Sequence, residues 1–199
     1  MYKGIAGSEG IGIGKVVIIE DHDITIETKH VPETDSEIAR LQEAIEKFVE
    51  ITNKMADKMD ETVGKKDADI LRGHIQMLQD PMIEEQISSL IIAEKITAEM
   101  AVDQVLEQTA EMFSQIPDEL LQQRATDFRD IKARMIKLLM GIEDVDISQV
   151  PAGTVLVAKD LTPSMTAGIN PANIAGILTE VGGRTSHSAI LARAMEIPA

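Results

Sequence analysis

The spacing of apolar residues changes twice along this chain, and these changes limit the folds it can adopt. Between about residues 36 and 141, apolar residues recur every three or four positions, as in helices with one buried face. On either side, short runs rich in valine and isoleucine indicate strands. We therefore expect an α/β unit built from both ends of the chain, with an antiparallel helical bundle inserted between them.

The central region is predicted to contain five helices, because proline and glycine interrupt its apolar pattern. The first helix is expected to run from Ser36, as its cap, to Gly64, with Thr52 as the polar step in its apolar face. Pro81 and Pro117 separate later segments. The residues expected on the buried faces are Ile38, Leu41, Ile45, Phe48, Met55, Met59, Ile70, Leu71, Ile75, Leu78, Ile83, Ile87, Leu90, Ile91, Ala101, Val102, Val105, Met112, Leu121, Phe128, Ile131, Met135 and Leu138.

Strand candidates lie near both ends of the chain, at 16–19, 153–158 and 175–180. The first, VVII, is suited to a buried strand. Between the other two, Thr162 can cap a short helix begun by Pro163, an order typical of α/β units with partly parallel pairing. The GIGIG run before the first strand lacks the spacing of a dinucleotide fingerprint and the ending of a P-loop. We interpret its glycines as turns and close backbone packing.

The acidity of the chain is concentrated in the predicted bundle. We expect residues 1–32 and 145–199 to form the α/β unit and residues 33–144 the bundle. Residues 33–144 hold 25 Asp and Glu against 13 Lys and Arg, a net charge of −12 out of −15 for the whole chain. Most of these charges are expected on solvated helix faces. A field of this sign disfavours nucleic acid and anionic membranes as partners and steers basic proteins inward.

The composition also limits the chemistry. The chain has no cysteine, which excludes disulfides and thiolate metal sites and suits a reducing compartment. Charges interrupt every apolar stretch before it reaches the length of a membrane span, and no signal peptide pattern opens the chain. We therefore expect a cytoplasmic location.

The stretch GGRTSHSAILAR, residues 182–193, is the strongest candidate for a reactive site. It follows a predicted strand and begins a predicted helix, so it belongs at the carboxyl edge of the sheet, where α/β proteins usually bind ligands. Thr185 or Ser186 can cap the helix, which places His187 in its first turn, near free backbone N–H groups. A neutral imidazole there is a competent nucleophile toward phosphorus, and the N–H groups would hold the phosphate. Arg184 and Ser186 are expected to contact its oxygens, with Thr162 approaching from the other loop.

Each of these features also has an ordinary structural explanation. A histidine near a helix start more often caps or packs, and a glycine pair alone is uninformative. Of the other histidines, His22 and His30 lie in a charged stretch and have no partner at ligand spacing, and His74 lies in the middle of a predicted helix. We therefore expect no metal site in this chain.

Several motifs together resemble the amino-terminal region of enzyme I of the bacterial phosphoenolpyruvate:sugar phosphotransferase system. They are GGRTSHSAILAR with the following EIPA, DLTPS at 160–164, the opening GIAGSEGIGIGK and the GHIQMLQDP helix junction. The GG-R-T-S-H element alone is shared with the swivelling phosphohistidine domains of pyruvate phosphate dikinase and phosphoenolpyruvate synthase. The inserted acidic bundle favours enzyme I.

The resemblance implies a specific role for His187: phosphoenolpyruvate phosphorylates its Nε2, and it passes the phosphoryl group to a histidine of the phosphocarrier protein HPr. HPr would dock on the bundle, on a cluster that is apolar in its centre and acidic at its rim. Some members, such as Leu78, are equally suited to the core. The docking residues implied by the family match are His74, Met77, Leu78, Asp80, Met82, Glu84 and Glu85.

The rest of an enzyme I is expected outside this sequence. The resemblance implies further strands of the α/β unit and a carboxyl-terminal barrel that binds phosphoenolpyruvate and Mg²⁺ and forms a homodimer. We therefore expect the α/β unit to be truncated after Ala199, with no cofactor and no phosphoenolpyruvate site in this fragment.

Two alternatives stay open at this point. The first is the swivelling domain of a dikinase or synthase, which the start of the chain directly on the enzyme I pattern disfavours. The second is a non-catalytic module whose acidic bundle recruits a basic protein and whose histidine is incidental.

Overall fold

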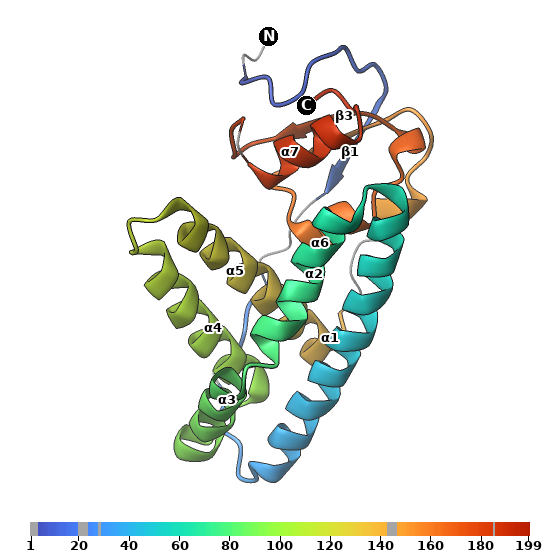
Figure 1. The fold of residues 1–199 in the computed structure, drawn as a ribbon. Coiled ribbons are helices and arrows are strands. Elements are labelled where there is room, and N and C mark those ends of the chain that lie inside the picture. Colours follow the sequence, from blue (N-terminus) through green and yellow to red (C-terminus); the bar gives the residue numbers. More distant parts are fainter. Residues whose placement is uncertain (1–3, 20–23, 28, 143–146, 185) are drawn as a thin grey trace. The chain divides into compact units, whose positions relative to one another are not determined.

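A computed structural model describes residues 4–19, 24–27, 29–142, 147–184 and 186–199. It shows the predicted combination of a small α/β unit and a helical bundle inserted into it (Figure 1). The elements in chain order are β1 (Lys15–Ile19), α1 (Asp35–Thr62), α2 (Lys65–Leu78), α3 (Pro81–Glu94), α4 (Ala98–Ser114), α5 (Glu119–Met140), β2 (Thr154–Ala158), α6 (Pro163–Ala167), β3 (Ile174–Thr179) and α7 (His187–Ala194), with 3₁₀ turns at Ile147–Gln149 and Pro171–Asn173.

The chain divides into two compact units. The α/β unit consists of residues 1–23, 58–68 and 145–199, and the helical unit of residues 24–57 and 69–144. The turn between α1 and α2 therefore groups with the α/β unit, which the predicted domain boundaries did not include.

Helix ends in the helical unit follow from local capping. Asp80 caps α3 by accepting a hydrogen bond from the Met82 N–H at 2.9 Å, and Asp118 caps α5. Gly141 ends α5 in the left-handed conformation, with φ of 66°. The prediction that Ser36 caps α1 is wrong, because the helix already begins at Asp35 and the Ser36 hydroxyl donates to the Glu33 carbonyl.

The predicted apolar faces form the core of the helical unit. Phe48, Ile87, Ile91 and Ile131 are fully buried, and the adjacent helices α4 and α5 lie side by side (Figure 1). The prediction of a buried side chain is wrong for two apolar residues, since Met112 is 60% exposed and Leu121 is 37% exposed. Both lie close to the turn between α4 and α5, where fewer neighbouring helices cover an apolar side chain.

The sheet of the α/β unit has the order β1-β2-β3 with parallel neighbours. The prediction of a buried first strand is wrong, because β1 is an edge strand whose Val16 and Ile18 are about 60% exposed. The close packing predicted for the preceding glycines is confirmed. A Cβ added at Gly12 would lie 2.1 Å from the Ala175 carbonyl oxygen, and one at Gly14 would lie 2.0 Å from that of Gly153.

No helix within the described ranges combines the length and the apolar character needed to cross a membrane.

Candidate functional site

The loop from β3 to α7 gives His187 its position. Gly182 adopts φ of 113°, a conformation that favours glycine, and turns the chain after the strand. Ser186 caps α7, since its Oγ accepts a hydrogen bond from the Ala189 N–H at 3.3 Å while donating to the Gly183 carbonyl at 2.8 Å. His187 is the first residue of α7 and is half-buried. The alternative cap, Thr185, lies outside the described residues.

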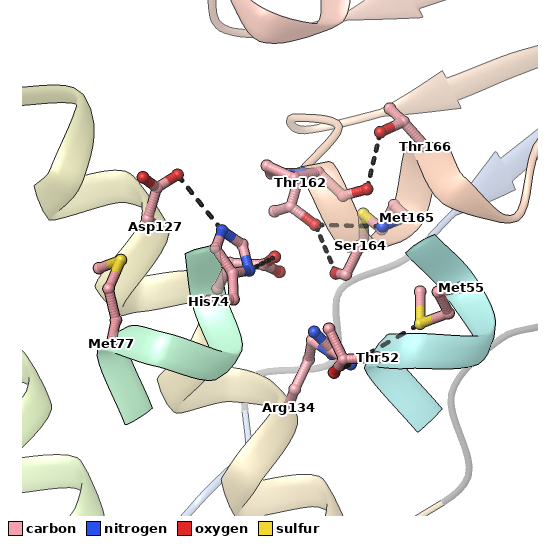
Figure 2. Close-up of polar contacts among 12 residues, drawn as sticks. Thr52, Met55, His74, Met77, Asp127, Arg134, Thr162, Ser164, Met165 and Thr166 are labelled. Atoms are coloured by element: carbon pink, nitrogen blue, oxygen red, sulfur yellow. Dashed lines mark hydrogen bonds and ion pairs between the residues drawn. The ribbon is translucent and has the colours of Figure 1, made fainter. Parts of the chain in front are cut away.

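The His187 ring meets a hydroxyl from α6. Its Nε2 lies 3.4 Å from Thr166 Oγ1, and this hydroxyl also donates to the Pro163 carbonyl at 2.8 Å (Figure 2 shows the Thr166 bond). Because the Thr166 hydroxyl donates to that carbonyl, its oxygen is available to accept a hydrogen bond from Nε2 in the tautomer that carries the proton there.

Thr162 lies at the N-cap of α6, where its Oγ1 accepts from the Met165 N–H at 3.4 Å and is 3.0 Å from Ser164 Oγ (Figure 2). The helix thus uses Thr162 for its own start and brings Thr166, four residues later, to the histidine. Thr166 is not among the site residues predicted from the sequence. Its spacing from Thr162, one helical turn, was the available signal.

The two other predicted phosphate ligands are built into the same loop. Ser186 is occupied by its capping role and lies 3.0 Å from Ser188 Oγ. Arg184 is exposed, and its backbone carbonyl accepts a hydrogen bond from Arg193 at 2.9 Å. This arrangement places a histidine, a helix N-terminus and an exposed cation together, which is a combination suited to receive a phosphoryl group.

The predicted docking residues separate into two groups. Met82 is 66% exposed, and Glu85 and Asp80 are exposed as well. Met77 and Glu84 are half-buried. By contrast, His74 and Leu78 are fully buried, so their side chains present no surface to a partner in this conformation.

The surroundings of His74 are polar although the residue is buried. Its Nε2 lies 3.4 Å from Asp127 Oδ1, and its Nδ1 lies 3.6 Å from Asp130 Oδ2, so α2 and α5 meet through this ring (Figure 2). Arg124 on the same helix lies 3.5 Å from Asp127 and donates to Met77 Sδ at 3.6 Å. The His74 ring of α2 therefore lies against two carboxylates of α5.

A surface pocket adjoins the exposed docking residues. It has a volume of about 520 Å³ between α3 and α4 and is lined by Met82, Glu85, Gln86, Ser89, Leu90, Ala93, Val105 and Gln108. This pocket is not among the features predicted from the sequence. The available signal was the composition of α3, which carries apolar residues outside its buried stripe of Ile83, Ile87 and Ile91.

Within the described residues, no group of three or more His, Asp or Glu side chains could hold a metal ion. His22 lies outside the residues that the structure describes.

Comparison with known proteins identifies two family models. The PEP-utilising enzyme N-terminal family matches residues 3–124, and the PEP-utilising enzyme mobile domain matches residues 150–199. Curated relatives named phosphoenolpyruvate-protein phosphotransferase include those of Haemophilus influenzae, 37% identical over 100% of this chain, and Mycoplasma capricolum, 38% identical over 99%. The chain spans 35% and 34% of their lengths.

Solved structures agree with these matches. The solution NMR structure of Enzyme I (nEIt) is 39% identical, with a TM-score of 0.85, and the match covers 100% of this chain and 81% of that one. The N-terminal domain of Enzyme 1 - Nitrogen shares the fold, with a TM-score of 0.67 over 98% of this chain and 80% of that one, at 23% identity. The chain therefore belongs to the family of PEP-utilising enzymes and resembles the amino-terminal region of enzyme I over its whole length.

Proposed function

We propose that this chain is the phosphoryl-relay region of an enzyme I, with His187 as the residue that carries the phosphoryl group. The supporting observation is the agreement of two independent features. The whole chain matches phosphoenolpyruvate-protein phosphotransferases, and the one histidine at a helix N-terminus among the described residues is His187. A phosphohistidine at this position would lie against backbone N–H groups and the positive end of α7.

In the proposed reaction, His187 Nε2 attacks the phosphorus of phosphoenolpyruvate. A nitrogen–phosphorus bond forms, and the bond between phosphorus and the enolate oxygen breaks. In the second step, a neutral histidine of HPr attacks the same phosphorus, and the bond to His187 breaks. Before His187 attacks phosphoenolpyruvate, its Nε2 must leave the contact with Thr166 Oγ1 at 3.4 Å and present an unprotonated lone pair to phosphorus. In the second transfer the same nitrogen is the leaving group.

We propose that HPr docks on the corner where α2 ends and α3 begins. The exposed and half-buried members of the predicted set, Met77, Asp80, Met82, Glu84 and Glu85, offer a sulfur-containing apolar centre with acidic neighbours. Such a surface suits a transient complex with a basic protein. His74 and Leu78, which are buried, would then contribute indirectly, by holding α2 in place.

The remaining parts of the proposed activity belong to residues outside this chain. The phosphoenolpyruvate site, the Mg²⁺ that supports it and the contacts that form a homodimer are assigned to the rest of the enzyme. The complete protein would act in the cytoplasm as the first step of sugar uptake by the phosphotransferase system.

Intact-mass measurement tests the proposed function. The protein is mixed with phosphorylated HPr at alkaline pH, because phosphohistidine is acid-labile. We expect the mass of one phosphoryl group on the parent and none on His187→Ala, with HPr binding retained by both. A phosphoryl gain that persists in His187→Ala would overturn the site assignment. Binding of HPr without any gain in the folded parent would instead favour a non-catalytic docking module.

A further inference from the structure

Arg193 lies in the last turn of α7, and its guanidinium donates hydrogen bonds to two segments outside that helix. One nitrogen donates to the carbonyl of Arg184, nine residues earlier, at 2.9 Å. A second nitrogen donates to the carbonyl of Gly7, near the start of the chain, at 2.5 Å. A single side chain therefore joins the loop before His187 to the N-terminal segment.

The N-terminal segment is itself fixed against α7. The N–H groups of Gly7 and Ser8 donate to the Ala199 carbonyl at 2.8 and 3.1 Å, and the Ala199 N–H returns a bond to Ser8. A Cβ at Gly7 would lie 3.0 Å from the Ala189 Cβ, so the segment packs directly on the first turns of α7. The Gly7 carbonyl is therefore a well-anchored acceptor for Arg193.

The other acceptor lies in the loop that carries the reactive histidine. Arg184 follows the turn at Gly182 and is three residues from His187. A planar guanidinium that donates to two carbonyls in different directions fixes both more firmly than a single-point donor such as lysine can. Fixing the Arg184 peptide limits the movement of the loop and of the proposed phosphate-binding side chain of Arg184.

We propose that Arg193 is a positioning residue for phosphoryl transfer at His187, because it holds the β3–α7 loop and the N-terminal segment in one hydrogen-bonded frame. This inference rests on the proposed function. Arg193 is not proposed to contact His187 Nε2 or the phosphorus. It keeps the loop in the geometry in which His187 and Arg184 meet the phosphoryl group.

Three variants test the role: Arg193→Gln, Arg193→Lys and the control Lys159→Gln. The control removes one positive charge from an exposed position of the same unit, on the strand end that precedes α6. The initial rate of phosphoryl gain from phosphorylated HPr is measured against HPr concentration, together with the thermal midpoint. We expect the maximal rate of Arg193→Gln to fall about tenfold with an unchanged half-saturating HPr concentration. A misplacement of about 1 Å can cost about 100-fold, and the loss of one positioning side chain should displace the loop by less.

The conservative variant and the control complete the test. Arg193→Lys should recover part of the lost rate, and Lys159→Gln should match the parent. A maximal rate for Arg193→Gln equal to that of the parent would overturn the proposal. So would a rate loss that Lys159→Gln reproduces, since the effect would then be one of charge.

A spectroscopic readout separates this proposal from the proposed function. The ¹⁵N resonances of the His187 ring and of the Arg184 amide are compared in the unphosphorylated proteins, under conditions where each is folded. We expect them to shift in Arg193→Gln but not in Lys159→Gln. If the parent accepts no phosphoryl group, the proposed function fails while this readout still decides whether Arg193 holds the loop. Unshifted resonances would overturn the positioning role.

Discussion

The helical unit and the α/β unit use their polar side chains in different ways. In the helical unit, buried or half-buried charges join one helix to another: Arg40 pairs with Glu37 and Glu99 and also donates to the Leu139 carbonyl at 2.9 Å. In the α/β unit, the polar groups around His187 are mostly loop hydroxyls and backbone groups that shape one turn.

This contrast separates stability from chemistry. Removing a buried charge partner in the helical unit leaves another charge without compensation, so the cost falls on folding. Changing the loop of the α/β unit removes little buried surface, so the cost falls on the position of His187. The histidines show the same difference, since His74 is enclosed by α2 and α5 while His187 begins a helix beside a glycine-containing loop.

The largest effect on stability is expected for Arg40→Met. Glu37 and Glu99 are 7% and 9% exposed, so they would lose their cation in a largely buried setting. The hydrogen bond from Arg40 to Glu99, followed by the nearby carboxylate charges, also raises the pKa of Arg40 despite its partial burial. We expect a loss of about 2–3 kcal/mol in the free energy of unfolding, measured in urea. Lys47→Met is the control, because its exposed pair with Glu43 should contribute only about 0.3 kcal/mol. Equal losses would contradict the proposed structural role of the Arg40 cluster.

A smaller effect on folding but a clear one on transfer is expected for Gly182→Ala. Its φ of 113° strains any residue with a Cβ, and that Cβ would lie 3.2 Å from Ser186 Oγ, the cap of the reactive helix. We expect about 1–2 kcal/mol of local strain and slower phosphorylation of His187. Gly183→Ala is the matched control, since a Cβ there meets no atom within 4 Å. A transfer rate in Gly182→Ala that equals the control would show that the loop does not position the histidine.

Docking is expected to respond to Glu85→Gln mainly through the association rate. Glu85 is exposed on α3, and a basic partner approaches along the field of such charges. We expect the association rate with HPr to fall by about two- to threefold at low salt and less at high salt. Glu46→Gln removes the same charge from α1 and serves as the control. Equal effects of Glu85→Gln at all ionic strengths would count against electrostatic steering.

The smallest effect is expected for the pH dependence of the free energy of unfolding that arises from the ion pairs between α4 and α5. Burial alone would raise the pKa of Glu107, but hydrogen bonds from Lys132 at 2.8 Å and Arg129 at 3.0 Å outweigh burial and lower it. Because the folded-state pKa is the lower one, this carboxylate stabilises the protein above its unfolded pKa and loses that contribution as pH falls through the folded value. We expect Glu107→Gln to remove less than about 1 kcal/mol at pH 7 and the difference from the parent to vanish in acid. The free energy of unfolding is measured in urea at several pH values. A difference between Glu107→Gln and the parent that grows as the pH falls would contradict the lowered pKa of Glu107.

The helices and most of their buried faces could be predicted because a helix repeats its environment every three or four residues. Phe48, Ile87 and Ile131 follow that rule and are buried. Met112 and Leu121 do not follow this rule. Near the α4–α5 turn, the exposure of an apolar side chain depends on whether a neighbouring helix covers it.

The position of His187 could be predicted because strand, glycine turn, cap and helix are consecutive in the sequence. Its contact with Thr166 and the link from Arg193 to Gly7 could not be predicted in this way. They join segments separated by 21 and 186 residues, and only the folded topology brings these together.

The most direct test of the central claim is to locate the phosphoryl group by ³¹P–¹⁵N coupling in protein with ¹⁵N-labelled histidines, after incubation with phosphorylated HPr at alkaline pH. If His187 carries the phosphoryl group, one ring will be coupled, that of His187 through Nε2, and the ring signals of buried His74 will be unchanged. Coupling at any other histidine, or at none while HPr still binds the folded protein, would contradict it.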